Sequence, residues 1–311
     1  MKRTRIILLI AGGFILFSFQ FILIRNYVDN VCHGVPYMAE HKPGKKPVIY
    51  CHKIISTDTH DEYGMHFSPD ARTLYFIREL EDGPAMMQSG QGVYGWTRPR
   101  EIHFKKGLVV REACFNPDET SLLLVLRDEK DGSEALYISN REAKGWSSPE
   151  EITDTLPGQG IGSLSVSLSG TVCYSEKINP GHHPDIRITH YRNQQYMLPW
   201  NPGANINTPY RETDPFIAPD EKYLLFSSDR PGGYGGADLY ISHFIRGRGW
   251  GPAINLGPSI NTERDEGRPY LSPDGEYLFF SRNRKQNRDI YWVSSEAIET
   301  YTTLAAKNTL P

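Results

Sequence analysis

The chain has 311 residues, of which 39% are hydrophobic, 12% aromatic and 23% charged, and its formal net charge is -3. This composition excludes a disordered chain, because disorder requires low hydrophobicity and high net charge. The near-neutral balance also argues against nucleic acid as a partner, since phosphate-binding surfaces need clustered Lys and Arg. The 28 Gly and 22 Pro indicate many turns and short strands, in two modules or in one large all-β domain.

The first predicted element is a membrane-spanning helix within residues 1–25. Residues 6–24, IILLIAGGFILFSFQFILI, contain Gln20 as their only strongly polar side chain and lie between basic residues. About 19 helical residues span roughly 28 Å, close to the ~30 Å hydrocarbon core of a bilayer. A cleaved signal peptide is the main alternative, but its apolar region is usually shorter, and Ser18-Phe19-Gln20-Phe21 does not resemble its small-residue cleavage site. A buried soluble helix is the third alternative.

The basic residues ahead of the span predict a cytoplasmic N-terminus by the positive-inside rule. The chain after Arg25 then lies outside the cytoplasm, in the periplasm or an equivalent space. Residues 26–46 contain Pro36, Pro43 and Gly44 and show no sustained periodicity, so we expect a tether there.

Four cysteines follow the span, and an exported chain can form disulfides. Cys32 and Cys51 both lie near the tether and are the first pair to test for a bridge. Cys114 and Cys173 lie within apolar strand patterns, where a free cysteine behaves as a small buried hydrophobe. The sequence leaves the disulfide state open.

The chain from residue 47 onward repeats with a period of about fifty residues, and such a period indicates a repeat architecture. A Pro-Asp dipeptide aligns four copies, and a fifth copy is degenerate. The copies are MHFSPDARTLYFIR (65–78), ACFNPDETSLLLVLR (113–127), LSVSLSGTVCYSEK (164–177), PFIAPDEKYLLFSSDR (215–230) and PYLSPDGEYLFFSRNR (269–284). Further signatures are an apolar run beginning near residues 135, 185, 238 and 289, and an aromatic-Pro-Ile element beginning at Trp96, Trp146 and Trp250.

Each copy holds four short β-type runs separated by turn signals. The Pro-Asp dipeptide favours a tight turn, because Pro fixes φ and Asp bonds its own backbone. Runs such as YLLFSS are almost wholly apolar, as expected of strands covered on both faces. Four strands in a repeat of this length are typical of a β-propeller. We therefore predict an all-β propeller of five four-stranded blades over residues 47–295.

The repeat resembles the WD40-like repeat of TolB-type propellers. The resemblance is carried by the pattern Ser/Ala-Pro-Asp, Leu-x-Phe-Ser, Asp-Leu-Tyr-Ile-Ser and Gly-Trp, best seen in residues 212–242 and the following GWGPAINLGPSINT. It implies a periplasmic interaction module, an envelope-complex component or a domain that accompanies an enzyme. Members usually have six blades, so the resemblance also allows a sixth. The third copy departs most, with Leu168-Ser169 in place of Pro-Asp and a scrambled element at 196–199.

The two ends of the repeat predict how the ring closes. The last copy lacks its outermost strand, and residues 47–56, PVIYCHKIIS, form an unassigned strand ahead of the first copy. We expect residues 48–54 to pair with residues 289–293 and complete the last blade. Residues 296–311 follow as a C-terminal helix and tail, with the helix over 296–307 capped by Ser294 or Ser295.

Charged residues precede the Pro-Asp turn in four copies, where a propeller has the mouth of its central channel. This predicted ligand-binding set is Asp61, Glu62, Arg111, Glu112, Glu212, Asp214, Asp265, Glu266 and Arg268. Converging carboxylates can bind a hard cation such as Ca²⁺ or supply a general acid and base. The alternative is that these residues cap loops and pair with one another.

Three other motifs have structural explanations that compete with functional ones. His182, His183 and Asp185 suggest a metal cluster or a plain turn between strands. The glycines of residues 232–236 lack a following helix, so we expect an Ω-like turn rather than a phosphate loop. The repeated tryptophans suggest filling between blades or a stacking surface for a ligand.

The sequence contains no nucleophile elbow, P-loop, dinucleotide fingerprint or zinc-protease motif. The favoured hypothesis is a membrane-anchored, extracytoplasmic propeller that presents its loops to an envelope protein of unknown identity, without a catalytic residue or cofactor. The alternative is a carbohydrate- or peptide-binding or hydrolysing protein that uses the acidic channel mouth, with a bound cation such as Ca²⁺.

Overall fold

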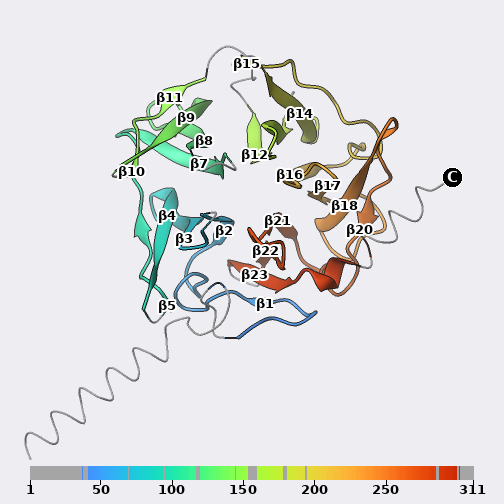
Figure 1. The fold of residues 1–311 in the computed structure, drawn as a ribbon, viewed down its shortest axis with the longest axis horizontal. Helices are drawn as coiled ribbons and strands as arrows, with labels where there is room; N and C mark the ends of the chain where they lie inside the picture. Colours follow the sequence, from blue (N-terminus) through green and yellow to red (C-terminus); the bar gives the residue numbers. More distant parts are fainter. Residues whose placement is uncertain are drawn as a thin grey trace, which may run out of the picture.

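Five antiparallel sheets surround one axis in the computed structural model, so the protein is a five-bladed β-propeller (Figure 1). The structure describes residues 37, 41–68, 70–93, 95–116, 120–143, 145–152, 160–177, 181–192, 195–284, 287–299 and 301. Within these residues no helix is both long and apolar enough to cross a membrane. The span predicted at residues 6–24 lies outside them.

Each blade begins with its innermost strand and adds strands outward. Blade 1 contains β2 (Glu62–Phe67), β3 (Thr73–Leu80), β4 (Gly83–Gly92) and β5 (Gly95–Trp96), and β6 (Arg100–Glu101) also pairs with β4. Blade 2 contains β7 (Leu108–Phe115), β8 (Ser121–Asp128), β9 (Glu134–Glu142) and β10 (Gly145–Trp146), and β11 (Glu150–Glu151) also pairs with β9.

The remaining blades follow the same plan. Blade 3 contains β12 (Ile161–Val166), β13 (Thr171–Glu176), β14 (Asp185–Arg192) and β15 (Gln195–Tyr196). Blade 4 contains β16 (Glu212–Ile217), β17 (Tyr223–Ser228), β18 (Asp238–Ile245) and β19 (Gly249–Trp250), and β20 (Ile254–Asn255) also pairs with β18. Blade 5 contains β21 (Glu266–Leu271), β22 (Tyr277–Asn283), β23 (Arg288–Ser294) and β1 (Val48–Ile49).

The hydrophobic core is divided into five clusters, one at each junction between neighbouring blades. At the junction of blades 1 and 2, for example, Tyr75 and Ile77 of β3 belong to the same cluster as Leu124 of β8. Both faces of the second strands are buried in this way, which explains why these strands are almost wholly apolar.

The Pro-Asp turns join the first and second strands as predicted. In blade 5, the Ser272 hydroxyl donates to the Asp274 carboxylate (2.6 Å), which also accepts from the backbone N–H of Glu276. Blade 3 has no aspartate at this position. There the Ser167 hydroxyl donates to Glu221 of blade 4 (2.6 Å), so a neighbouring blade supplies the missing carboxylate.

The predicted closure of the ring is confirmed, over a shorter segment than expected. β1 pairs antiparallel with β23, with Val48 opposite Trp292 and Ile49 opposite Tyr291. The strand ends there because the chain turns at Cys51, which has a positive φ of 42°.

The cysteines differ in state. Cys51 is disulfide-bonded, and Cys32, the first candidate for its partner, lies outside the described residues. Cys114 and Cys173 are buried free thiols, as their strand patterns predict. Burial raises the pKa of the Cys114 thiol to about 12.

The C-terminal helix begins where the sequence predicts. Residues 296–299 and 301 are helical, and the Ser294 hydroxyl accepts from the backbone N–H of Glu296. Ile298 of this helix is buried against blades 4 and 5. The remainder, 302–311, lies outside the described residues.

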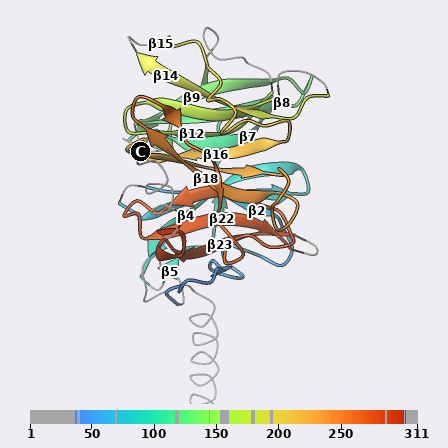
Figure 2. The same cartoon turned by 90° about the vertical axis from the view of Figure 1, so that its right-hand side faces the viewer.

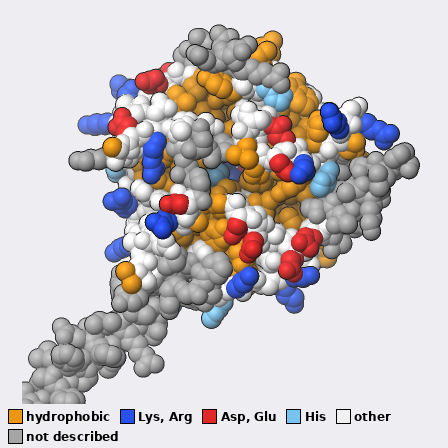
Figure 3. All heavy atoms as spheres, in the orientation of Figure 1, with side chains coloured by type: hydrophobic (Ala, Val, Ile, Leu, Met, Phe, Trp, Pro, Cys, Tyr) orange, Lys and Arg blue, Asp and Glu red, His pale blue; other side chains and the backbone are white. Residues whose placement is uncertain are grey.

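The ring has two faces, because the strands run from one side of it to the other (Figure 2). We call one the connector face; it carries the segments that join successive blades, including 57–61, 103–107, 207–211 and 261–265. We call the other the Pro-Asp face, which carries the turns near residues 70, 168, 220 and 274. On the face shown in Figure 3, hydrophobic side chains gather around the centre, and Lys and Arg lie mainly around the rim.

Candidate functional site

One residue of each innermost strand lies beside the axis, at or next to an irregularity in the strand register. These residues, all of which line the same central cavity, are Gly64, Glu112, Ser163, Asp214 and Arg268. Bulges in inner strands redirect side chains and are common beside functional sites. The axis is therefore the first place to look for chemistry.

Arg268 links three blades at the axis. Its Nε lies 3.0 Å from Oδ1 of Asp214 in blade 4, and its Nη1 binds Oε2 of Glu112 in blade 2. The backbone N–H of Asp214 donates to Oγ of Ser163 in blade 3 (2.9 Å). Blades 2, 3, 4 and 5 thus meet in one polar network.

Two of these axial residues have a strained backbone conformation. Asp214 and Arg268 have φ values of 53° and 55°, a left-handed conformation that side chains disfavour, and Gly64 takes the same conformation in blade 1 without that cost. Such strain persists where surrounding contacts hold it. Here the ion pair between the two residues supplies that contact.

The cavity at the axis is small. Its volume is about 30 Å³, which is room for about one water molecule, whereas ligand pockets usually measure about 300–1,000 Å³. Burial raises the pKa of Asp214 and lowers the pKa of Arg268 to about 10. Burial, aided by the nearby Arg268, also lowers the pKa of His66 at this cavity to about 4.

Three of the predicted glutamates lie elsewhere, in an arrangement that we call the clasp. In blade 5, Glu266 accepts from the backbone N–H (3.0 Å) and hydroxyl (2.6 Å) of Thr262 and from Nε of Arg282 (2.7 Å). Nη2 of the same arginine donates to the carbonyl of Ile260 (2.5 Å). The clasp therefore fixes the connector that enters blade 5.

The same clasp recurs at two other junctions. Glu212 binds Thr208 and Arg230 in blade 4, and Glu62 binds Thr57 and Arg78 in blade 1. All three glutamates are completely or almost completely buried. Burial raises the pKa of Glu62 to about 7, opposed by its bonds to Thr57 and Arg78, and raises the pKa of Glu266 in the same way.

The residue between the isoleucine and threonine of each connector binds the preceding blade. The side-chain amide of Asn261 accepts from the N–H of Leu239 (2.8 Å) and donates to its carbonyl (3.0 Å). Asn207 makes the same pair of bonds with Ile186, at 2.8 and 2.9 Å. The Ile-Asn-Thr triplets at 206–208 and 260–262 were the sequence signal for these clasps, which the sequence reasoning missed.

The remaining predicted residues bind backbone or sit at the surface. Asp61 accepts from the backbone N–H of Arg288 (2.7 Å), and Asp265 accepts from that of Ala237 (2.9 Å). Arg111 pairs with Glu134 at 3.4 Å, and both side chains are partly exposed. The predicted set therefore divides: Glu112, Asp214 and Arg268 meet at the axis, and the other six do not join them.

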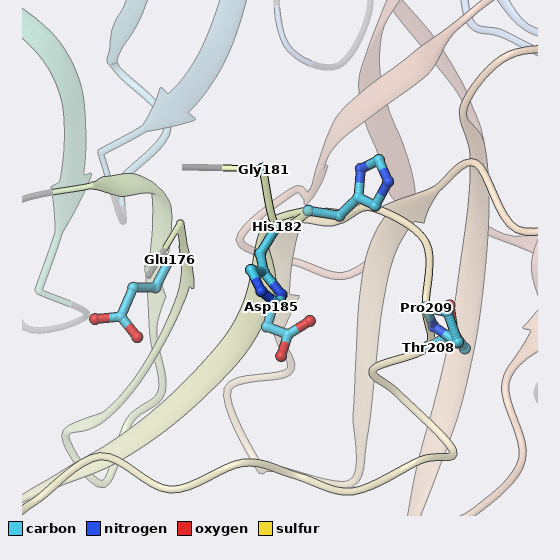
Figure 4. Close-up of a pocket in the computed structure, with 7 residues that line it drawn as sticks. Glu176, Gly181, His182, Asp185, Thr208 and Pro209 are labelled. Carbon is cyan, nitrogen blue, oxygen red and sulfur yellow. The ribbon is translucent and has the colours of Figure 1, made fainter. Parts of the chain in front are cut away.

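Among the described residues, three hollows open on the connector face. Their volumes are about 440 Å³ between blades 1 and 2, about 430 Å³ between blade 3 and the connector that enters blade 4, and about 450 Å³ between blade 5 and the connector that enters it. Figure 4 shows the second, where Glu176 and Thr208 lie on opposite sides of His182 and Asp185. The third is lined by Arg264, Arg282 and Arg284.

His182 and His183 lie in the turn that enters β14, as the structural explanation predicts. In the described part of the chain, no group of three or more His, Cys, Asp or Glu side chains is arranged to hold a metal ion. The glycines of 232–236 also lie in a turn. A side chain at Gly235 would meet the carbonyl of Thr262 at 2.2 Å, so glycine is required where this turn touches the connector.

Two of the repeated tryptophans fill the core between blades. Trp96 and Trp250 are buried, and the Trp96 indole N–H donates to the Tyr50 hydroxyl (2.7 Å). Trp146 is half-buried against Phe115. The filling role predicted for this position therefore accounts for Trp96 and Trp250.

No protein-family model matches the chain, and no curated protein sequence matches it. Among solved structures, a TolB protein of Agrobacterium tumefaciens is similar with a TM-score of 0.50 and 15% identity, over 76% of this chain and 78% of that chain. TolB of Acinetobacter baumannii is similar with a TM-score of 0.48 and 17% identity, over 76% of this chain and 55% of that chain. A gluconolactonase of Xanthomonas campestris has a TM-score of 0.47 and 13% identity, over 81% of this chain and 95% of that chain. At these identities the likeness shows the fold alone, which is a β-propeller.

Proposed function

We propose that the protein is an extracytoplasmic scaffold, anchored by residues 6–24, that binds a protein partner of a bacterial envelope through its connector face. The observation that carries the proposal is the repeated clasp. Three of the five connectors are fixed by a buried glutamate, a threonine and an arginine, so the loops of this face are held in place before a partner arrives. Preorganised loops bind with less loss of conformational entropy.

The hollows between blades supply a second argument. Protein interfaces draw much of their energy from a few side chains that enter such pockets. The three hollows that the described residues form have different linings: a mixed polar and apolar one with Lys105 and Lys106, one with His182 and Asp185, and one rich in arginine. A partner with matching side chains would gain both affinity and orientation there.

The alternative, a carbohydrate- or peptide-acting protein with an acidic channel mouth, has less support. It needs several carboxylates that face a shared opening, whereas Glu62, Glu212 and Glu266 are each held by an arginine of the same blade. The variants Glu212→Gln and Glu266→Gln test it directly. If wild type binds Ca²⁺ or an oligosaccharide and these variants do not, the alternative is favoured. If neither the wild type nor the variants bind these ligands, the scaffold is favoured.

Co-purification of the full chain from crosslinked membranes tests the scaffold itself. Wild type is compared with a variant in which the exposed Glu263 of the connector face is replaced by Arg. We expect one or a few envelope proteins that are recovered with wild type and reduced with Glu263→Arg. Recovery of the same background proteins in both samples would refute the proposal.

A further inference from the structure

Blade 3 differs from its neighbours in the chemistry of its outer edge. The aromatic residue that opens this edge is Trp96 in blade 1, Trp146 in blade 2 and Tyr196 in blade 3, and each pairs with the blade's third strand. The residues at one, two and four positions after it are Thr, Arg and Arg in blade 1, and Ser, Ser and Glu in blade 2. In blade 3 they are Met197, Leu198 and Trp200.

These three apolar side chains are exposed. Leu198 is 89% exposed, Met197 50% and Trp200 40%. Tyr191, which pairs with Tyr196 and contacts its ring at 4.9 Å, is 47% exposed, and Leu168 in the adjoining turn is 70% exposed. The backbone N–H of Tyr191 donates to the carbonyl of Gly170, which places Tyr191 beside the turn that contains Leu168. We call these five residues, Leu168, Tyr191, Met197, Leu198 and Trp200, the blade 3 patch.

We propose that the blade 3 patch is the contact through which the protein forms a symmetric dimer with a second copy of itself. The first reason is charge. None of the five side chains is charged, so the patch meets its own copy without repulsion between like charges. In a two-fold dimer the same surface is used twice, which an uncharged patch permits.

The second reason is area. Large side chains bury about 150–250 Å² each, so the exposed fractions of the five residues correspond to roughly 550 Å² of surface. Two patches then bury about 1,100 Å², and a specific interface needs about 1,000 Å² or more. On a monomer, the patch would be among the larger apolar patches that soluble proteins expose.

The third reason is rigidity and position. Both ladder hydrogen bonds between Ile188 and Trp200 are formed, at 2.9 and 3.1 Å, so the edge is fixed. Pro199 interrupts it, which favours contact through side chains over the addition of a strand. Blade 3, with β14 and β15, lies on the opposite side of the ring from β1 (Figure 1). A dimer joined through blade 3 therefore leaves both β1 strands at its outer ends.

The experiment transfers the blade 1 edge onto blade 3 of the full chain. The variant carries Met197→Thr, Leu198→Arg and Trp200→Arg, and blade 1 shows that a propeller edge accepts these residues. The control is Ser148→Arg, at the position of blade 2 that matches Leu198. Mass is measured by sedimentation in detergent of known density, from about 1 to 50 µM protein, where a specific dimer is populated.

We expect wild type and Ser148→Arg to be dimers, and the triple variant to be a monomer with its dissociation constant raised at least ~100-fold, since loss of two central contacts costs about 3 kcal/mol or more. Leu198→Cys should give a disulfide-linked dimer in membranes, because the free thiols of Cys114 and Cys173 are buried. Leu198→Ser should weaken the dimer but leave unchanged the melting temperature measured at concentrations where both proteins are monomers, which separates this effect from misfolding. A monomeric wild type, or a dimer that the triple variant leaves intact, would overturn the proposal. Neither result bears on a partner at the connector face.

Discussion

Ser56 and Ile290, 234 residues apart, exchange two hydrogen bonds where the ring closes. The Ser56 hydroxyl accepts from the N–H of Ile290 at 3.2 Å and donates to its carbonyl at 3.3 Å. Ser56 thereby takes the place that Asn207 and Asn261 have in the connectors that enter blades 4 and 5. The closing junction is thus built like the junctions within the chain, although its two sides come from opposite ends of the sequence.

Replacement of Ser56 by Ala should weaken this closure. It leaves the buried backbone N–H of Ile290 without a partner, which costs about 1–3 kcal/mol, whereas the Ile290 carbonyl still accepts from the N–H of Tyr50. For a domain of this size the melting temperature should fall by about 2–10 °C. Circular dichroism of the full chain measures it, with the exposed Ser148→Ala as the control. Equal melting temperatures for the two variants would show that the bonds to Ile290 do not stabilise the ring.

The clasp predicts a graded response at Glu266. Glu266→Ala leaves Arg282 buried without its carboxylate, which should lower the free energy of unfolding by about 3–5 kcal/mol. Glu266→Gln should cost less, because the amide oxygen still accepts from Thr262 and Arg282. Chemical denaturation measures both, and exposed Glu263→Ala should change stability by less than about 0.5 kcal/mol. The reverse order, with Gln worse than Ala, would contradict this account of the clasp.

Arg268 should be the most sensitive residue at the axis. Arg268→Met leaves the carboxylates of Glu112 and Asp214 buried together, and the free energy of unfolding should fall by about 3–5 kcal/mol. Addition of Glu112→Gln removes one of those charges and should restore part of the loss. A double variant less stable than Arg268→Met would be inconsistent with an ion-pair network at the axis.

The dependence of folding stability on pH should include a contribution from His66. Its pKa is lowered to about 4 by burial, whereas the unfolded value is about 6.5. Between these values the unfolded chain binds more protons, so this contribution is present above pH 6.5 and is lost as the pH falls toward 4. Its size is at most about 3 kcal/mol.

His66→Gln should therefore lose less stability than wild type between pH 7 and pH 4.5, measured as the difference between their melting curves. The exposed His183→Gln serves as the control and should follow wild type. A His66→Gln curve parallel to wild type over this range would show that His66 titrates normally.

The fold was predictable because its signals are local and repeated. The Pro-Asp turn and the apolar second strand recur in phase, and they predict the number of blades and the turn chemistry. The missing outermost strand of the last copy predicts that residues 48–54 pair with residues 289–293, and residues 48–49 of this segment pair with β23. Blade 3 was the least regular copy, and the structure shows why it still forms: Glu221 replaces its missing aspartate, and Trp200 pairs with Ile188.

The candidate site was only partly predictable, because the exact position of a residue along its strand decides the environment of its side chain. Glu112 and Glu62 look equivalent in sequence, since each opens its copy ahead of the Pro-Asp turn. Counted back from the proline, however, Glu62 is seven positions away and Glu112 only five, which places Glu112 at the axis with Asp214 and Arg268. The clasp arginines lie 16 to 18 residues after their glutamates, so their pairing required the structure.

The central claim, that the connector face binds a protein partner, is tested most directly by photo-crosslinking in the native host. A photoreactive amino acid is placed at Glu263 on the connector face, with an 85% exposed side chain, or at Lys222 beside a Pro-Asp turn, with a 78% exposed side chain. The account predicts a specific crosslinked protein of discrete mass from position 263 and none from position 222. A crosslink from position 222 alone, or none from either position, would contradict it.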